Sequence, residues 1–252
     1  MSAIIAKFCF QRSWIMVLHQ EILWGLSLAD WLAVGWFMLC WAGYTSYAER
    51  KARRRDCLSS ILHRQRRRWM SEMIARDNRV ADAALLANLE RNVAFFASST
   101  LIILAGVFTV LSATDKAISI AAELPFAVAA PAAAWEVKLI LLTGIFVYAF
   151  FKFTWSLRQY GFASVVIGMA PGNGSRDRVN AESFAEEAAQ VISRAALAFN
   201  LGLRSYYFGL AFLIWFVNPW FFALATTWVV GVLYRREFKS SVLQALVRTY
   251  NA

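Results

Sequence analysis

Cysteine and histidine are scarce in this sequence, and their scarcity removes several classes of site. Cys9, Cys40 and Cys57 are widely separated and form no CxxC pair, so they support neither a disulfide framework nor a zinc or redox motif. His19 and His63 flank the first apolar run, and this placement excludes an intramembrane histidine pair on one haem. We therefore predict no cofactor and no metal.

The common catalytic motifs are missing as well. The chain has no GxxxxGK[ST], HExxH, GxSxG or GxGxxG pattern, and residues 172–175 lack the strand-to-helix context of a phosphate loop. We therefore predict a protein without enzymatic activity.

Acidic residues are few, with 16 against 26 basic ones. No nucleic-acid recognition module accompanies the basic clusters, so nucleic acid is not a predicted partner.

Apolar residues, in contrast, make up 60% of the chain, which predicts an all-α integral membrane protein. About 20 residues rising roughly 1.5 Å each cross a hydrocarbon layer roughly 30 Å thick. By this measure residues 22–252 form a single transmembrane domain, a bundle of five helices. The expected spans are residues 23–47, 92–112, 135–155, 199–217 and 219–234.

The last two spans are read from one apolar run. Between Arg204 and Arg235 lie 30 uncharged residues, which as one helix would extend roughly 45 Å. Asn218 followed by Pro219 is typical of a helix cap and a first helical residue, so one helix should end near Val217 and another begin there. A single kinked helix, giving four spans, is the alternative.

The basic residues predict the orientation. Residues 48–92 carry 12 of them, residues 156–204 carry five and the tail from Arg235 carries four, whereas residues 113–135 contain only Lys116. Five spans place all three basic segments on one side, as the positive-inside rule favours for the cytoplasm. The predicted topology has the N-terminus outside, the C-terminus in the cytoplasm and a basic cytoplasmic loop at residues 48–91.

Three further segments lie outside the spans. A basic surface helix is expected from about Arg64 into the second span, and an amphipathic helix over residues 177–198 leads into the fourth. Residues 1–21 form an N-terminal extension without a convincing signal-peptide cleavage site. Met16 is an alternative start to Met1.

Arginine clusters in the cytoplasmic loop are candidate contacts with anionic lipid or a protein partner. Each basic side chain near an anionic leaflet contributes about 1 kcal/mol to binding. The candidate residues are Arg53, Arg54, Arg55, Arg66, Arg67 and Arg68.

A second set consists of ionisable side chains in or at the ends of spans, where an unpaired charge costs at least about 2.5 kcal/mol near the bilayer centre. These residues are Asp30, Glu136, Lys138, Lys152, Arg158 and Arg204. Asp30 and the pair Glu136 and Lys138 should lie toward the outer face, where an external ion pair can form. An ion or proton path is one interpretation. Anchoring by snorkelling lysines and cation–aromatic contacts is the more common arrangement and the one we favour.

Seven blocks of sequence carry a further signal. They are Asp30–Leu32, Arg64–Met70, Arg76–Asp82, Phe95–Thr100, Phe150–Tyr160, Asn218–Trp220 and Tyr234–Phe238. Together they resemble the bacterial membrane-protein family called domain of unknown function 599, over about residues 26–239. The resemblance implies a polytopic protein of the bacterial inner membrane and carries no assigned activity or site.

These features together predict an accessory or structural subunit without enzymatic activity. It would dock to anionic lipid or to a membrane protein, as a homo-oligomer or as part of a larger complex. The alternative is a channel or transporter for a small ion or solute. That alternative requires a polar cavity linking Asp30 or Glu136 with Lys152 and Arg204.

Overall fold

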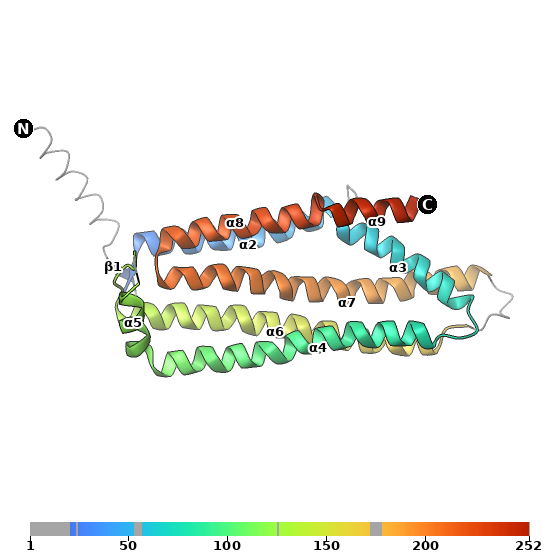
Figure 1. Ribbon diagram of the computed structural model, residues 1–252, viewed down its shortest axis with the longest axis horizontal. Helices are drawn as coiled ribbons and strands as arrows, with labels where there is room; N and C mark the ends of the chain where they lie inside the picture. The colour runs from blue at the N-terminus through green and yellow to red at the C-terminus, as the bar shows by residue number, and fades with distance from the viewer. Residues whose placement is uncertain (1–20, 24, 53–56, 125, 172–177, 252) are drawn as a thin grey trace, which may run out of the picture. The chain divides into compact units, whose positions relative to one another are not determined.

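The computed structural model describes residues 21–23, 25–52, 57–124, 126–171 and 178–251 (Figure 1). Among them, β1 (Glu21–Leu23) pairs with β2 (Leu26–Ser27) in a short antiparallel ladder, and the remaining elements are helical. Five long helices fall on the expected apolar segments: α2 (Leu28–Ala52), α4 (Val80–Ser112), α6 (Ala132–Gly168), α7 (Arg178–Leu213) and α8 (Pro219–Phe238). Three shorter helices are α3 (Leu58–Ile74), α5 (Thr114–Ala122) and α9 (Ser241–Asn251). The predicted N-terminal extension, up to residue 20, lies outside the described residues.

Three helical segments of the described chain are long and apolar enough to cross a membrane. They are α4, α6 and Ala181–Phe216, and they confirm an all-α membrane protein. The 37 residues of α6 extend roughly 55 Å at helical rise, well beyond a hydrocarbon layer of roughly 30 Å. The predicted span at residues 135–155 is therefore only part of a longer helix. That α2 and α8 also cross remains a prediction.

The break expected at Asn218 and Pro219 is present. Helix α7 gives way to a 3-10 turn at Ile214–Phe216, and α8 begins at Pro219. The Asn218 side-chain oxygen accepts the Trp220 backbone N–H at 2.9 Å, so it caps a donor that the helix itself cannot satisfy. Proline has no backbone N–H, but at the first position of a helix that N–H would have no acceptor within the helix. Proline therefore costs no hydrogen bond at Pro219.

The expected continuous helix from Arg64 into the second span is wrong. Helix α3 ends at Ile74 and α4 begins at Val80, where the Asn78 side-chain oxygen accepts the Val80 N–H at 2.9 Å. Asparagine bonds readily to the backbone two residues ahead, which favours a turn over continued helix. By contrast, α7 is one helix from Arg178, as expected for the segment that leads into the fourth span.

The described chain divides into two compact units. Unit 1 comprises residues 1–46, 105–144 and 207–230, and its described core is rich in aromatic side chains. The Phe37 ring lies 5.7, 5.6 and 5.2 Å from the ring centroids of Phe208, Phe212 and Phe222. Such ring pairs add to the burial of apolar area, about 0.5–1.5 kcal/mol each.

Unit 2 comprises residues 47–104, 145–206 and 231–252, and small residues allow its helices to approach closely. Four alanines of α7, at 185, 188, 189 and 195, are almost completely buried. At Gly202 an added Cβ would lie 2.5 Å from the Phe153 ring. Helix α3 lies beside α9 in this unit, where the Gln65 amide donates to the Leu246 carbonyl at 3.1 Å (Figure 1).

Candidate functional site

The candidate site begins at the N-terminus of α2, where Ser27 and Asp30 cap each other. The Ser27 N–H and hydroxyl donate to Asp30 Oδ2 at 3.0 and 2.6 Å, and the Ser27 hydroxyl accepts the Asp30 N–H at 3.2 Å. This reciprocal arrangement is a capping box with aspartate in the position usually held by glutamate or glutamine. It holds the carboxylate against the first turn of α2.

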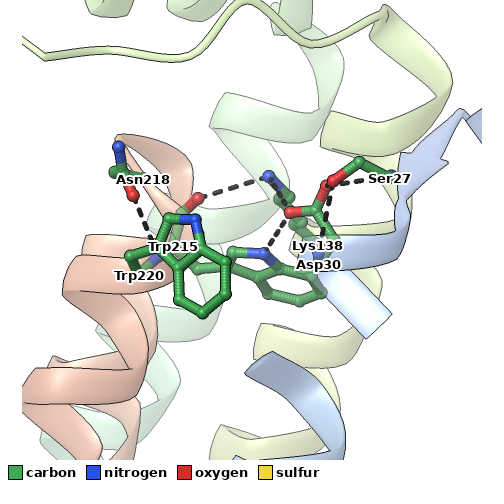
Figure 2. Close-up of polar contacts among 6 residues, drawn as sticks. All are labelled: Ser27, Asp30, Lys138, Trp215, Asn218 and Trp220. Atoms are coloured by element: carbon green, nitrogen blue, oxygen red, sulfur yellow. Dashed lines mark hydrogen bonds and ion pairs between the residues drawn. The ribbon is translucent and has the colours of Figure 1, made fainter. Parts of the chain in front are cut away.

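The other carboxylate oxygen of Asp30 meets Trp215 and Lys138. The Trp215 indole Nε1 donates to Asp30 Oδ1 at 2.6 Å, and the Lys138 ammonium lies 3.4 Å from the same oxygen. Both contacts are drawn as dashed lines in Figure 2. The ammonium also donates to the Trp215 backbone carbonyl at 3.2 Å. Asp30 is 8% exposed, Lys138 3% and Trp215 0%, so this ion pair is buried within unit 1.

Aromatic packing fixes the position of Trp215. Its ring stacks on Phe222 at 5.4 Å and meets Phe212 edge-on at 5.0 Å. Lys138 Nζ lies 4.9 Å from the centroid of the Trp215 ring, a distance at which a cation is attracted to the face of an indole. Trp215 therefore contacts both charges through its indole and its carbonyl.

The ion pair lies in the wall of a cavity of about 260 Å³, which we call the Asp30–Lys138 cavity. The wall is formed by the start of α2, the segment before α6 and the junction of α7 with α8. Its residues are Gly25, Ser27, Asp30, Val128, Ala129, Ala130, Pro131, Lys138, Trp215, Val217 and Pro219. The Val128 N–H donates to the Val217 carbonyl at 2.9 Å and so ties two of these segments together.

Gly25 shapes this wall from the turn between β1 and β2. Its φ is +70°, in the left-handed region that favours glycine. A Cβ at this position would lie 2.6 Å from Pro131 Cγ. Glycine therefore permits both the turn and the close approach of Pro131.

Asp30 forms an ion pair with Lys138, and no ion pair of Glu136 is found among the described residues; that the pair lies toward the outer face stays a prediction. Glu136 is exposed whereas Lys138 is buried, because side chains two residues apart on a helix point to nearly opposite faces. Trp215 and Ser27 were not expected as members of the cluster. The spacing of Ser27 and Asp30 is a capping signal visible in the sequence, but no local pattern indicates the role of Trp215.

The three other expected intramembrane charges belong to unit 2 and do not line this cavity. Lys152 is half-buried and lies 5.2 Å from the Tyr148 ring centroid, one helical turn before it. The Arg158 guanidinium lies 5.7 Å from the ring centroid of Phe162, one helical turn after it. These contacts support the cation–aromatic interpretation for both residues. Arg204 is half-buried on α7.

The arginines proposed to contact lipid or a partner differ from one another. Arg66 is half-buried and donates to the Ser193 hydroxyl at 3.3 Å, while burial lowers the pKa of its guanidinium from the ordinary value. The Arg67 Nε lies 2.8 Å from Glu186 Oε2, and Arg68 is exposed. Arg53, Arg54 and Arg55 lie outside the described residues.

Sequence comparisons give a family and nothing more specific. A family model described as "Protein of unknown function, DUF599" matches residues 32–242, a range that includes Lys138 and Trp215 and begins two residues after Asp30. No curated protein and no solved structure matches the chain. Because the match covers more than half of the sequence, this chain belongs to the DUF599 family of proteins of unknown function.

Proposed function

We propose that this protein is a channel or transporter that binds a small ion or solute in the Asp30–Lys138 cavity. The observation that carries the proposal is a buried ion pair in the wall of a cavity, in a chain whose helices are long enough to cross a membrane. Ionisable groups in such chains are costly to bury and commonly mark ion or solute pathways. Sequence alone favoured an accessory subunit, and the cavity supports ion or solute binding at Asp30 and Lys138. Lys152 and Arg204, which a continuous polar path would also need, do not line it.

The cavity has the size of a small solute. Its volume of about 260 Å³ is below the range of roughly 300–1,000 Å³ that is usual for drug-sized ligands. At roughly 30 Å³ for each water in the liquid, it has room for roughly eight water molecules. The polar groups of this wall, among them Ser27, Asp30 and Lys138, can orient a ligand of that size.

Flux through proteoliposomes tests this proposal. The full-length protein is reconstituted, and entry of sodium acetate, sodium chloride, potassium chloride and glycine is followed by stopped-flow light scattering. We expect at least one solute to enter faster than in protein-free vesicles. The double variant Asp30→Asn with Lys138→Met should lose that excess, because it removes both buried charges.

The matched control is Asp115→Asn with Lys116→Met. These neighbouring residues are also an acid and a base of unit 1, but both are exposed on α5. Their replacement should leave the flux unchanged. Entry no faster than in empty vesicles for every solute, or full activity of the variant without the buried charges, contradicts the proposal.

A second candidate function, docking to anionic lipid as an accessory subunit, is favoured by a different observation. Among the described residues, all lysines and arginines except Lys116 and Lys138 belong to unit 2, and Arg68 is exposed there. We expect phosphatidylglycerol nanodiscs to raise the melting temperature above that in phosphatidylcholine, and Arg68→Gln to reduce this difference. Equal melting temperatures in both lipids contradict the docking function.

We further propose five crossings of a bacterial inner membrane, with the N-terminus outside and the C-terminus in the cytoplasm. Support comes from unit 2, where α3 of the basic loop bonds to α9 of the basic tail through Gln65 and Leu246. Leu124 and Val242 are exposed, so each is replaced by cysteine in a variant whose native cysteines are alanine. Membrane-impermeant maleimide should label intact cells through Leu124→Cys only. Labelling through Val242→Cys in intact cells contradicts five crossings.

A further inference from the structure

We infer that the Asp30–Lys138 cavity binds a small monovalent anion. This inference rests on the proposed function, because it assigns a ligand class to the same cavity. Its basis is an imbalance in hydrogen bonding. The Asp30 carboxylate has no remaining position to accept a hydrogen bond, whereas the Lys138 ammonium retains an N–H donor.

The carboxylate of Asp30 is fully used. An ionised carboxylate offers about four lone-pair positions. Oδ2 accepts two hydrogen bonds from Ser27, and Oδ1 accepts one from Trp215 and faces the Lys138 ammonium. A cation or a ligand ammonium in the cavity would therefore have to displace a buried partner of Asp30.

The ammonium of Lys138 is not fully used. It has three N–H donors. Among the residues that the structure describes, it meets two acceptors, Asp30 Oδ1 and the Trp215 carbonyl. Nζ also lies 4.9 Å from the centroid of the Trp215 ring, which is a weaker partner than an oxygen acceptor. Because Lys138 lines the cavity, we assign its third N–H to a ligand there.

The surrounding helix ends add positive partial charge. The cavity wall includes Ser27, Pro131 and Pro219, which lie at or next to the first residues of α2, α6 and α8. Each helix N-terminus carries about half a positive charge, which favours an anion over a cation. The Ser27–Asp30 capping box already satisfies the start of α2, so the contribution that favours negative charge in the described wall comes from the starts of α6 and α8.

The end of α7 is the opposing feature, because carbonyl oxygens at a helix C-terminus repel anions. Two carbonyls at this end that belong to wall residues already have donors. The Trp215 carbonyl accepts from Lys138, and the Val217 carbonyl accepts from the Val128 N–H. The repulsion at this end is therefore reduced.

Thermal unfolding of the full-length protein in phosphatidylcholine nanodiscs tests the ligand class. Sodium acetate and sodium chloride are titrated separately at constant ionic strength, with sodium gluconate as the large balancing anion. A ligand that binds only the folded state raises the melting temperature in a saturable manner. We expect this rise with acetate, with chloride or with both, and the comparison identifies the preferred anion. Tetramethylammonium gluconate and glycine should produce none.

Variants locate the effect in the cavity. Lys138→Met should weaken the apparent affinity by about tenfold or more, since it removes the charged donor. Asp30→Asn with Lys138→Met should do the same, and it leaves no buried charge unpaired, so it should disturb folding less than either loss of charge alone. Asp115→Asn with Lys116→Met should respond as the unmodified chain does.

Two results would overturn the inference. One is an anion response that persists in the variant without the buried charges. The other is a melting temperature that rises with tetramethylammonium or with glycine. A melting temperature that none of the probes raises would overturn it as well. Anion binding without flux would reject the transport function and leave the anion site standing. Flux selective for cations would support transport and reject the anion site.

Discussion

The Trp215 indole donates a 2.6 Å hydrogen bond to Asp30, a residue 185 positions earlier in the chain. The backbone carbonyl of the same tryptophan accepts from Lys138 at 3.2 Å. One rigid side chain, held by Phe212 and Phe222, thereby orients both members of a buried ion pair. This arrangement makes the stability of unit 1 sensitive to substitutions at each of the three positions.

Removal of the Asp30 carboxylate should be strongly destabilising. Asp30→Ala leaves Lys138 buried without its counter-charge, and breaking a buried pair in this way costs about 3–5 kcal/mol. Asp30→Asn should cost less, because the amide oxygen still accepts from Trp215 or from the Ser27 N–H, although the NH2 group then faces the other donor. Unfolding in detergent measures both free energies. Glu136→Ala is the control and should change stability by less than about 0.5 kcal/mol, since Glu136 is exposed.

The hydrogen bond from Trp215 can be removed while its aromatic ring is retained. Trp215→Phe keeps a ring against Phe222 but leaves Asp30 Oδ1 without the indole donor, which should cost about 1.5–3 kcal/mol. Trp220→Phe, at a position 56% exposed, should be close to neutral. Equal melting temperatures for the two variants would show that the indole hydrogen bond contributes nothing to stability.

Gly25 should not tolerate a side chain. Gly25→Ala places a Cβ 2.6 Å from Pro131 and forces a left-handed backbone on alanine, which alone costs about 1–2 kcal/mol. Gly35 lies in α2 with open space around it, so Gly35→Ala should stabilise by about 0.5–1 kcal/mol. Opposite signs in the unfolding free energy are expected, and a neutral Gly25→Ala contradicts the prediction.

Helix packing in unit 2 should depend on Gly202. Gly202→Ala would bring a methyl group to 2.5 Å from the Phe153 ring, and overpacking of this kind typically costs about 1–3 kcal/mol. Gly231→Ala in α8 has no neighbour within 4 Å and serves as the control. Adding Phe153→Leu to Gly202→Ala should recover part of the loss if steric overlap is its cause. No recovery would point to another cause.

The break between α7 and α8 at Asn218 could be predicted from sequence because its causes are local. The asparagine cap and the proline act on backbone groups within a few residues, so the printed sequence contains the whole interaction. The missed break after α3 is the same kind of interaction. Asn78 bonds to Val80, but the residues around it favour helix, so the turn is hard to recognise from sequence.

Pairs of charges were harder to predict, because a helix turns its side chains by about 100° per residue. Of Glu136 and Lys138, one faces the cavity and the other is exposed. Of the neighbours Arg66, Arg67 and Arg68, the first is half-buried against Ser193, whereas the other two are exposed and Arg67 also pairs with Glu186. A cluster in sequence therefore does not give all its members the same exposure.

The sequence by itself determined the all-α membrane class, the family and the positions of the long helices. These follow from apolar runs and from backbone hydrogen bonds that close within each helix. Only the tertiary structure decided that Asp30, Lys138 and Trp215 meet beside one cavity. Their separations in sequence exceed any helical period, so the meeting depends on how whole helices pack, which no local pattern encodes.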